Sequence, residues 1–451
     1  MSSSSYSILH IGFDDTDSLK GSCTTYIATK IIEKIYERVE FLDYPRLIRN
    51  NPNVPWRTRG NGAIAFSLRV KNDEFDEIIS ESIKIIDEFH QEDPNTNPGF
   101  AAIKDDIPLD IENFAVRALT EVISIKEAKI LAKKTCYKYH LIGNGRGIIG
   151  ALAAIGNTLN PKTDDFTFEL LAYRQSSSIG TKRKVDFESI KEMDSKLSPF
   201  VFNNIDEETG KDIICPAGLD PVLFGIRGEN AETLLKALKI VKAREAIEVY
   251  CIFRTNQGTD QHFKYSSSII RNFNTFKGEI EVTQSPKILS GGHIILKGMV
   301  TETGKIVDIA AFEPSKSFRK IIRELWEGDK ILAYGSVKYK PEFQIFTVQL
   351  EKCEIKEIAD RFKEESPFCS ECGKRMVSDG KDKGYKCRRC GYKDRNISKI
   401  KTSIERELLP GRYIPPAQAQ RHLVKPHVRY NLPSKDSFDF VKDWWKKYSS
   451  E

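Results

Sequence analysis

The chain of 451 residues contains no apolar run close to the roughly 18 residues that a membrane-spanning helix needs. Its start, MSSSSYS, has no basic segment followed by an apolar core, so we expect no secretion signal and a cytoplasmic location. Neither sign of charge dominates, and the net charge of +6 does not by itself indicate a nucleic-acid-binding protein. Internal repeats are absent, and Ser2–Ser5 is the only low-complexity segment. These absences favour a soluble globular protein.

Cysteine is also scarce, with nine residues in the chain, of which only four form a group. Cys369, Cys372, Cys387 and Cys390 make two C-x2-C pairs, the spacing at which four thiolates bind zinc tetrahedrally. This pattern favours a metal cluster in a reducing compartment over a disulfide framework or ordinary buried cysteines. Because four protein ligands leave no coordination position open, we expect the zinc to be structural. The surrounding basic residues either bind phosphates or form a solvated surface: Lys381, Lys383, Lys386, Arg388, Arg389, Lys393 and Arg395.

The length exceeds what one hydrophobic core supports and predicts three or four domains. Strand and helix patterns alternate in the first part of the chain, which predicts a layered α/β domain over residues 1–139. The expected strands there are 6–13 and 63–70, and the expected helices are 25–37, 75–89, 111–122 and 126–137.

A change to a glycine-rich composition near residue 140 marks the expected start of a ferredoxin-like α+β domain over 140–268. Its predicted strands are 166–173, 213–215, 222–226 and 248–253, with a helix at 231–241. Five strands follow within 278–357, with a helix at 318–326 between the third and fourth, the order expected of an OB-fold β-barrel. A zinc ribbon at 366–396 and a basic tail at 397–451 complete a multidomain α+β protein.

Three carboxylates, Asp14, Asp15 and Asp17, crowd together directly after the first expected strand. Like charges at this spacing repel one another unless a cation or a hydrogen-bonded turn compensates. Hard carboxylate oxygens suit magnesium bound together with substrate phosphates, so we predict magnesium at Asp14 and Asp17. Thr24 and Thr25 follow at the start of the expected helix, where a hydroxyl either caps the helix or accepts a phosphoryl group.

Two further segments are suited to bind phosphate. PRLIRNNPNVPWRTRGNGA is expected to be a rigid loop that presents arginines, although pairing with nearby acids is the alternative. GNGRGIIGALAA is either a phosphate-binding turn at a helix start or a tightly packed turn, and it fits neither a P-loop nor a Rossmann motif. The predicted ATP-binding residues in these segments are Arg57, Arg59, Gly60, Arg146 and Gly147.

Six segments resemble those of the archaeal isoleucine-tRNA agmatinylcytidine synthetase family, in the same order and from about Ile8 to the mid-420s. They are GFDDTDSLKGSCTT, PRLIRNNPNVPWRTRGNGA, GRGIIGALAAIGN, PVLFGIRGE, FEPSKSFRKIIRELWEGD and PGRYIPPAQAQRHL. The resemblance implies an ATP-dependent ligase that attaches agmatine to C2 of the wobble cytidine of isoleucine tRNA, so that the CAU anticodon reads AUA. It also implies a kinase-like first domain and cleavage of ATP to AMP.

The same resemblance implies roles for individual residues. Asp14, Asp15 and Asp17 orient the triphosphate with magnesium, Thr24 takes a phosphoryl group, and Arg57 and Arg59 hold phosphate charge. The barrel and the ribbon hold the tRNA, with the target base turned out of its stack. Agmatine is a dication and needs acidic partners, for which Asp220, Asp260 and Glu169 are unranked candidates. The base that deprotonates its amine is not identified by the sequence.

Two alternatives stay open at this point. One is a non-catalytic RNA-binding protein that uses only the barrel and ribbon, although a scaffold has no need of repelling acids. The other is a related enzyme that acts on another RNA position or amine. The partners implied are the tRNA and agmatine, with no membrane and no obligate protein partner. We expect the last aromatic residues to dock on the body rather than extend the RNA surface: Phe438, Phe440, Trp444 and Trp445.

Overall fold

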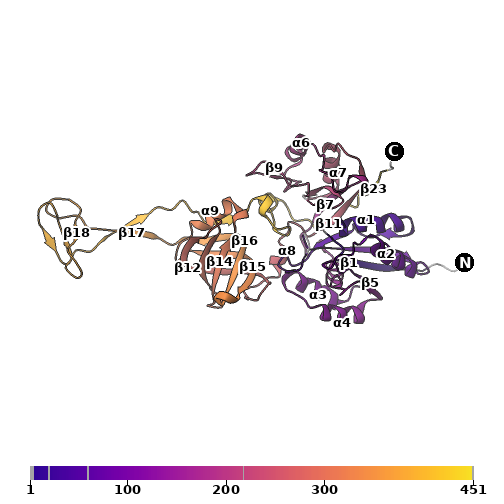
Figure 1. Ribbon diagram of the computed structural model, residues 1–451, viewed down its shortest axis with the longest axis horizontal. Helices are drawn as coiled ribbons and strands as arrows, with labels where there is room; N and C mark the ends of the chain where they lie inside the picture. The colour runs from indigo at the N-terminus through magenta and orange to yellow at the C-terminus, as the bar shows by residue number, and fades with distance from the viewer. Residues whose placement is uncertain (1–4, 19–20, 58–59, 217, 449–451) are drawn as a thin grey trace.

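The computed structural model describes residues 5–18, 21–57, 60–216 and 218–448. The molecule is elongated, with a large α/β body at one end, a β-barrel in the middle and a small cysteine module at the other end (Figure 1). Both chain termini lie at the body (Figure 1). Within the described residues, no helix is both long enough and apolar enough to cross a bilayer.

One continuous ten-stranded sheet forms the body and includes strands from both of the first two expected domains. Its main path runs β10 (Val222–Gly228), β7 (Thr167–Arg174), β11 (Ile247–Thr255), β3 (Arg46–Arg49), β4 (Gly62–Lys71), β1 (Tyr6–Asp14), β5 (Gly99–Lys104) and β6 (Lys138–Leu141). Two short strands lie off this path, β2 (Glu40–Phe41) beside β4 and β23 (Trp445–Lys447) beside β11. The two halves meet where β3 and β11 pair in parallel, with Arg46 opposite Arg254.

Helices cover this sheet because each has an apolar face or is buried throughout. They are α1 (Thr24–Ile35), α2 (Phe75–Phe89), α3 (Leu109–Thr120), α4 (Ile125–Thr135), α5 (Ile148–Gly156), α6 (Phe187–Leu197), α7 (Ala231–Ile240) and the short α8 (Gln261–Lys264). The glycine- and alanine-rich α5 is buried over nearly its whole length and packs on β1, β4 and α3. The segment that the sequence assigns to the second domain therefore contributes to the core around β1.

Several expectations need correction. The strand predicted at 213–215 is wrong: these residues form a bend, in which the Ile214 carbonyl accepts a hydrogen bond from the Gly225 N–H. The arginine segment predicted as a loop begins with a strand, β3, so Arg46 and Arg49 are fixed by strand pairing. The domain boundary expected at 139/140 stays a prediction, because the sheet continues across it.

Five strands close into a barrel, β12 (Thr275–Ile288), β13 (Ile294–Val300), β14 (Ile306–Ala311), β15 (Lys330–Lys340) and β16 (Ile345–Glu357). Parallel pairing between β14 and β16 completes the closure, and β22 (Gly411–Tyr413) extends the sheet beside β16. The helix α9 (Ser317–Arg323) lies between β14 and β15, which confirms the predicted order of five strands and one helix. Alternate residues of β13 point into the apolar barrel interior, as the period of two requires.

A two-stranded ladder, β17 (Arg361–Glu365) with β21 (Ile400–Ile404), leads from the barrel to the distal module (Figure 1). The distal module contains three strands of two residues each, β18 (Val377–Ser378), β19 (Tyr385–Lys386) and β20 (Lys393–Asp394). The remaining short elements are β8 (Ile205–Asp206), β9 (Lys211–Asp212) and 3-10 turns at 36–38, 176–178, 313–315, 341–343, 417–419 and 427–431.

The end of the chain returns to the body, which confirms the expected docking. Strand β23 pairs with β11, and Trp444 is 1% exposed within the body core. The Tyr44 hydroxyl donates a hydrogen bond to the Asp439 carbonyl (2.7 Å) and accepts one from the Val441 N–H (2.8 Å). Residues close to opposite ends of the chain therefore stabilise the same core.

Candidate active site

The acidic turn lies where β1 ends against the glycine-rich helix α5. Asp14 is the last residue of β1, and Asp15 adopts a left-handed backbone conformation with φ of 60°. A side chain at Gly150 would place its Cβ 1.8 Å from Asp14 Oδ2, and one at Gly147 would meet the Asp14 carbonyl oxygen at 2.4 Å. The glycines of this segment thus allow α5 to approach the acids closely, which favours the packed-turn interpretation for Gly147.

Asp15 is anchored by Arg146. The guanidinium donates from Nε and Nη2 to the two carboxylate oxygens at 3.0 Å each, and the Asn97 N–H donates to the same carboxylate at 3.2 Å. Burial nevertheless raises the pKa of Asp15, because the desolvation of its carboxylate outweighs these contacts. Arg146 therefore fixes the acidic turn, with its guanidinium held at the edge of the site rather than projecting freely.

Asp14 occupies the most unfavourable position for a negative charge. Its pKa is raised well above the usual value, first by burial and then by the neighbouring charge of Asp15, with Asp17 adding to the effect. A bound cation would relieve both penalties, because it replaces lost solvation and offsets the repulsion between carboxylates. The donor chemistry of Asp14 and Asp17 suits magnesium, since both offer hard oxygen ligands.

Asp17 and Thr24 form a hydrogen-bonded pair at the start of α1. Asp17 Oδ1 accepts hydrogen bonds from the Thr24 N–H (2.6 Å) and the Thr24 hydroxyl (3.0 Å). The Thr16 hydroxyl donates to the Thr24 oxygen at 2.9 Å. Asp17 thus supplies the helix cap, and the Thr24 hydroxyl is oriented toward a carboxylate that can take its proton. This geometry favours the phosphoryl-acceptor interpretation of Thr24 over simple capping.

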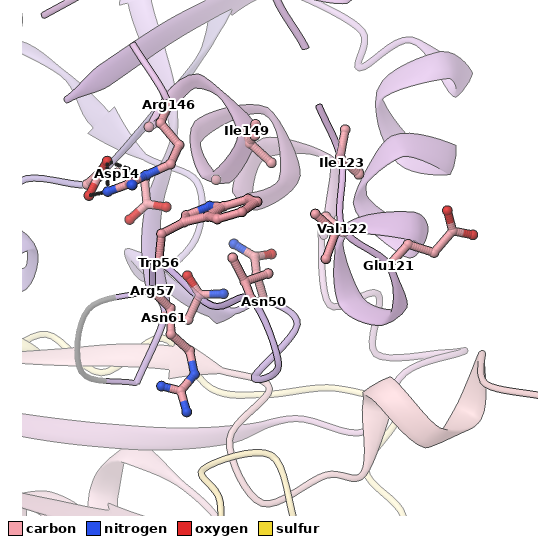
Figure 2. Close-up of a pocket in the computed structure, with 15 residues that line it drawn as sticks. Asp14, Asn50, Trp56, Arg57, Asn61, Glu121, Val122, Ile123, Arg146 and Ile149 are labelled. Atoms are coloured by element: carbon pink, nitrogen blue, oxygen red, sulfur yellow. Dashed lines mark hydrogen bonds and ion pairs between the residues drawn. The ribbon is translucent and has the colours of Figure 1, made fainter. Parts of the chain in front are cut away.

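The acidic turn separates two cavities. The first is lined by Asp14, Asp15, Arg146 and Gly147, and by Trp56 and Arg57 from the loop after β3. Figure 2 shows the indole of Trp56 lying between Arg146 and Asn50, with Arg57 directed away beneath it. Arg57 donates from Nε to the Pro52 carbonyl at 2.5 Å, and burial together with the charge of Arg421 lowers its pKa. Arg59 lies outside the described residues.

The second cavity has a volume of about 480 Å³, enough for a small organic ligand. Asp17, Thr24 and Gly60 line it, together with two of the three acids considered for agmatine, Glu169 and Asp220. The third, Asp260, does not line it. Asp260 is instead bound to Lys352 of the barrel and accepts hydrogen bonds from the Tyr430 hydroxyl (2.7 Å) and the Lys425 N–H (2.9 Å), so it joins the body to the barrel.

Three further polar residues line the second cavity: Arg49, one of the arginines of the segment expected to face phosphate, and Arg227 and His422, which the sequence did not single out. Glu169 lies between the two arginines, at 3.3 Å from Arg49 and 3.4 Å from Arg227. All three lie within segments of the family resemblance, namely PRLIRNN, PVLFGIRGE and AQAQRHL. The sequence therefore contained the motifs to which these residues belong, but only the fold shows that the three segments meet at one cavity.

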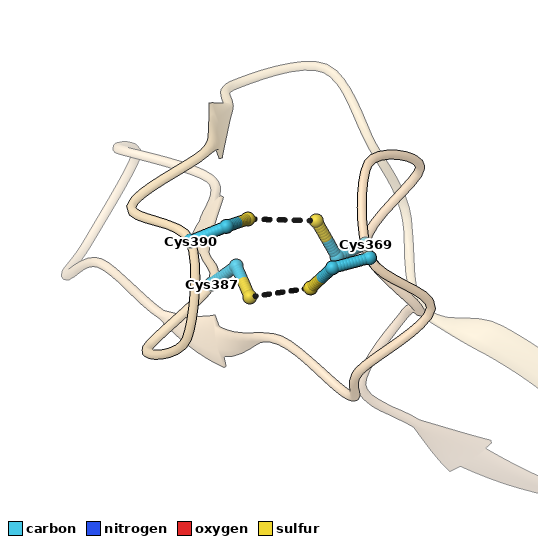
Figure 3. Close-up of side chains that lie close together, drawn as sticks. Cys369, Cys387 and Cys390 are labelled. Atoms are coloured by element: carbon cyan, nitrogen blue, oxygen red, sulfur yellow. Dashed lines mark hydrogen bonds between the residues drawn. The ribbon is translucent and has the colours of Figure 1, made fainter.

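The four cysteines at the distal end come together as predicted (Figure 3). Their sulfur atoms lie within 4.8 Å of one another, with Cys369 to Cys390 at 3.5 Å and Cys372 to Cys387 at 3.4 Å. Backbone N–H groups of Cys390 and Arg389 lower the pKa of the Cys387 thiol to about 6, which favours the metal-binding thiolate. In the part of the chain that the structure describes, this is the only group of three or more such ligands so close together.

The fold and the site together are typical of nucleotide-dependent enzymes that act on RNA. The features that indicate this class are the acidic turn with its oriented threonine, the two adjoining cavities, the closed barrel and the four-cysteine ribbon. Family models agree. The TiaS TCKD domain matches residues 10–143, the TiaS FLD domain matches 145–262, and the TiaS C-terminal zinc ribbon domain matches 366–408.

Full-length relatives extend this match. The isoleucine-tRNA 2-agmatinylcytidine synthetase TiaS of Methanosarcina mazei is 42% identical and covers 93% of this chain and 97% of its own length. That of Archaeoglobus fulgidus is 39% identical, with 95% and 99% covered. The crystal structure of TiaS in complex with its isoleucine tRNA and ATP superposes with a TM-score of 0.84 at 37% identity, over 96% of this chain and 100% of that chain. The complex of TiaS with the tRNA, AMPCPP and agmatine gives 0.80 at 34% identity, with the same coverage. The chain belongs to the isoleucine-tRNA 2-agmatinylcytidine synthetase family, TiaS.

Proposed function

We propose that this chain is an ATP-dependent ligase that attaches agmatine to C2 of the wobble cytidine of isoleucine tRNA with the CAU anticodon. The modified tRNA then decodes AUA. The observation that carries the proposal is the hydrogen-bonded contact of Thr24, at the start of α1, with Asp17 of a turn whose acids line two separate cavities. The solved relatives with tRNA, ATP and agmatine support it, since they share this fold along nearly the whole chain.

In this proposal the nucleotide binds at the acidic turn, with its phosphates between Asp14 and Asp15, which line the first cavity, and Asp17 and Thr24, which line the second. Asp14 and Asp17 would hold a magnesium ion, which when bound supplies positive charge to the phosphates. Arg57 lies at the edge of the first cavity and turns its guanidinium toward the phosphates when the nucleotide binds, while Arg146 keeps Asp15 in place. Arg59, Gly60 and Gly147 stay predictions as nucleotide contacts. Thr24 accepts a phosphoryl group during turnover, and ATP ends as AMP.

The second cavity receives agmatine and the wobble base. Phosphorylation of the cytosine O2 turns that oxygen into a leaving group, and the primary amine of agmatine displaces it at C2. Glu169 and Asp220 are the buried acids of this cavity; both pair with arginines, and we assign their remaining lone pairs as acceptors for the N–H groups of agmatine. The base has to leave its stack to reach the cavity, because C2 is otherwise shielded by its neighbours.

The rest of the molecule holds the tRNA. We assign the barrel as an OB-fold, the first part of the body as kinase-like and the second as ferredoxin-like. The zinc ribbon, with its basic surface, extends the binding surface far from the body (Figure 1) and contacts the phosphate backbone. Such an activity operates where tRNA matures, so we expect the enzyme in the cytoplasm.

Mass analysis of the wobble nucleoside tests the proposal directly. Incubation of the purified chain with ATP, agmatine and the tRNA should increase the mass of that nucleoside and release AMP. Lysine in place of agmatine should give neither product, because it has no guanidinium for Glu169 and Asp220 to bind. AMP release with no modified nucleoside would indicate another amine or position, and no nucleotide cleavage at all would leave only the RNA-binding alternative.

A further inference from the structure

His422 is held rigidly at the wall of the second cavity. Its carbonyl accepts a hydrogen bond from the Gly258 N–H (2.7 Å). The preceding Arg421 donates to the Pro52 carbonyl and to Asn53 Oδ1, both at 2.8 Å, which fixes this segment against the loop after β3. The imidazole itself is exposed to the cavity that also contains Thr24 and Asp17.

Gly60 makes room for this ring. A Cβ at Gly60 would lie 2.6 Å from His422 Cδ2, 2.7 Å from His422 Nε2 and 2.5 Å from Arg49 Nη1. The absence of a side chain at this position therefore lets the imidazole and the guanidinium reach the cavity together. This packing explains Gly60 without requiring a direct phosphate contact.

Three cations surround the imidazole. Desolvation by the cavity walls, followed by the positive charges of Arg49, Arg227 and Arg57, lowers the pKa of His422 well below its usual value. The acids of the same cavity are Glu169, Asp17 and Asp220. The ring is therefore neutral at physiological pH and offers an unshared electron pair, while the three cations oppose its protonated form, so it can hold a proton only in transit to solvent. The same guanidiniums disfavour the charged form of any amine that enters.

The acidic groups of the cavity already serve other partners. Asp17 accepts hydrogen bonds from Thr24, and Glu169 pairs with two arginines. Asp220 lies 3.0 Å from Arg183 and accepts a hydrogen bond from the Val222 N–H at 3.1 Å. Among the described residues, no side-chain hydrogen bond engages the His422 ring, so its nitrogens remain available to a ligand in the cavity.

We propose that His422 is the base that deprotonates the attacking amine of agmatine, a role that rests on the function proposed above. One N–H proton of the ammonium passes to the imidazole, and the freed lone pair forms the N–C2 bond. The C2–O bond then breaks, and phosphate leaves with its electron pair and the second amine proton. The imidazolium returns its proton to water. Phosphoryl transfer from ATP precedes these events and does not involve His422.

The test compares His422→Gln with a matched control, His427→Gln, which changes an exposed histidine five residues further along the same segment and outside the cavity. At pH 7, His422→Gln should slow agmatine transfer about 100-fold, a typical loss for a general base. Its ATP cleavage should stay within about twofold of wild type. Its transfer rate should rise about tenfold per pH unit between pH 6 and 9, as free amine accumulates, while wild type changes little. His427→Gln should match wild type throughout.

A second substrate shows whether His422 acts as a general base or only through packing. An aminooxy analogue of agmatine is unprotonated at neutral pH and needs no base, so His422→Gln should use it nearly as fast as wild type. Parallel pH profiles for His422→Gln and wild type, or loss of its ATP cleavage as well, would overturn the proposal. If wild type itself makes no agmatine-dependent product, it is the proposed function that fails.

Discussion

In the body, strands distant in the sequence meet in one sheet, whereas in the distal ribbon four cysteines hold together strands of only two residues each. The body buries a continuous apolar core that includes Trp444 from the end of the chain. The buried apolar cluster of the ribbon is far smaller and is formed by Cys369, Met376 and Cys387. A module this small lacks the core that folding requires, so metal coordination has to supply the stability.

Because of this difference, we expect substitutions in the body to impair catalysis and substitutions in the ribbon to impair tRNA binding. Packing in the body fixes the positions of Asp14, Asp17 and Thr24. The acids repel one another, and the large core of the body compensates for the free energy that this repulsion costs. The ribbon contributes a basic surface and a structural metal site. Damage to one region should therefore leave the function of the other intact.

The largest effect on activity is expected from the substitution Asp14→Ala. Loss of this carboxylate removes a predicted magnesium ligand, so ATP cleavage should fall by a factor of at least about 10³, while tRNA affinity stays within about twofold. The melting temperature should not fall, because the substitution relieves the repulsion of Asp14 by Asp15 and Asp17. Steady-state AMP release, tRNA titration and thermal unfolding check the three expectations.

Asp106→Ala is the matched control, since it removes an exposed carboxylate from the loop after β5. It should leave all three measurements unchanged. Undiminished AMP release by Asp14→Ala would remove the metal-site hypothesis, and a parallel loss of tRNA binding would show that the two regions are not separable.

Cys387→Ser tests the zinc ribbon, at the opposite end of the molecule from the body. Without one thiolate the ribbon should lose zinc and its fold, and tRNA affinity should fall about 10- to 100-fold because a basic surface is no longer presented. ATP cleavage measured at saturating tRNA should be unchanged. Cys136→Ser, a free cysteine of the body, is the control and should retain both zinc and affinity. Full tRNA affinity with zinc absent would contradict a binding role for the ribbon.

The sequence predicted the local features of the fold better than its long-range pairings. Helix 75–89 matches α2, and the barrel strands appear in the expected order, because period and turn residues are local signals. The parallel pairing of β3 with β11 joins residues about 200 positions apart, and no local pattern announces it. The residues at 213–215 are apolar enough to resemble a strand, but they form a bend with only isolated backbone hydrogen bonds, from Ile213 to Asn204 and from Gly225 to Ile214, and no strand ladder.

Part of the candidate site was accessible from the sequence. The four cysteines were found by their diagnostic spacing and come together in the structure, whereas Asp14, Asp17 and Thr24 stay predicted site residues, chosen because they lie close together in the chain. The roles of Gly147 and Gly150 depend on how closely α5 approaches Asp14, which only the packed structure shows. The sequence does not distinguish Asp260 from Asp220 as a candidate for agmatine binding. The structure does, because Asp220 lines the second cavity whereas Asp260 is bound to Lys352 of the barrel.

The smallest effect on activity is expected from Glu229→Gln, which tests whether the end of the chain belongs to the body. Glu229 is bound to Arg429 and lies 2.8 Å from Lys435. Burial opposes ionisation, but these cations outweigh it and lower the pKa of Glu229 below the usual 4.5. Its stabilising contribution is therefore present above pH 4.5 and is lost as the pH falls through the lowered value.

At pH 7 the Gln variant should reduce the free energy of unfolding by about 2 kcal/mol, with turnover at 25 °C unchanged within about twofold. The difference in stability from wild type should shrink as the pH falls below 4.5, because wild type then loses the same charge. Thermal unfolding across this range measures both trends, and Glu232→Gln, which changes an exposed glutamate three residues further on at the start of α7, should show neither. A difference that persists unchanged in acid would mean that Glu229 acts through packing, and the docked tail would then owe its position to aromatic contacts such as those of Trp444 with Phe41.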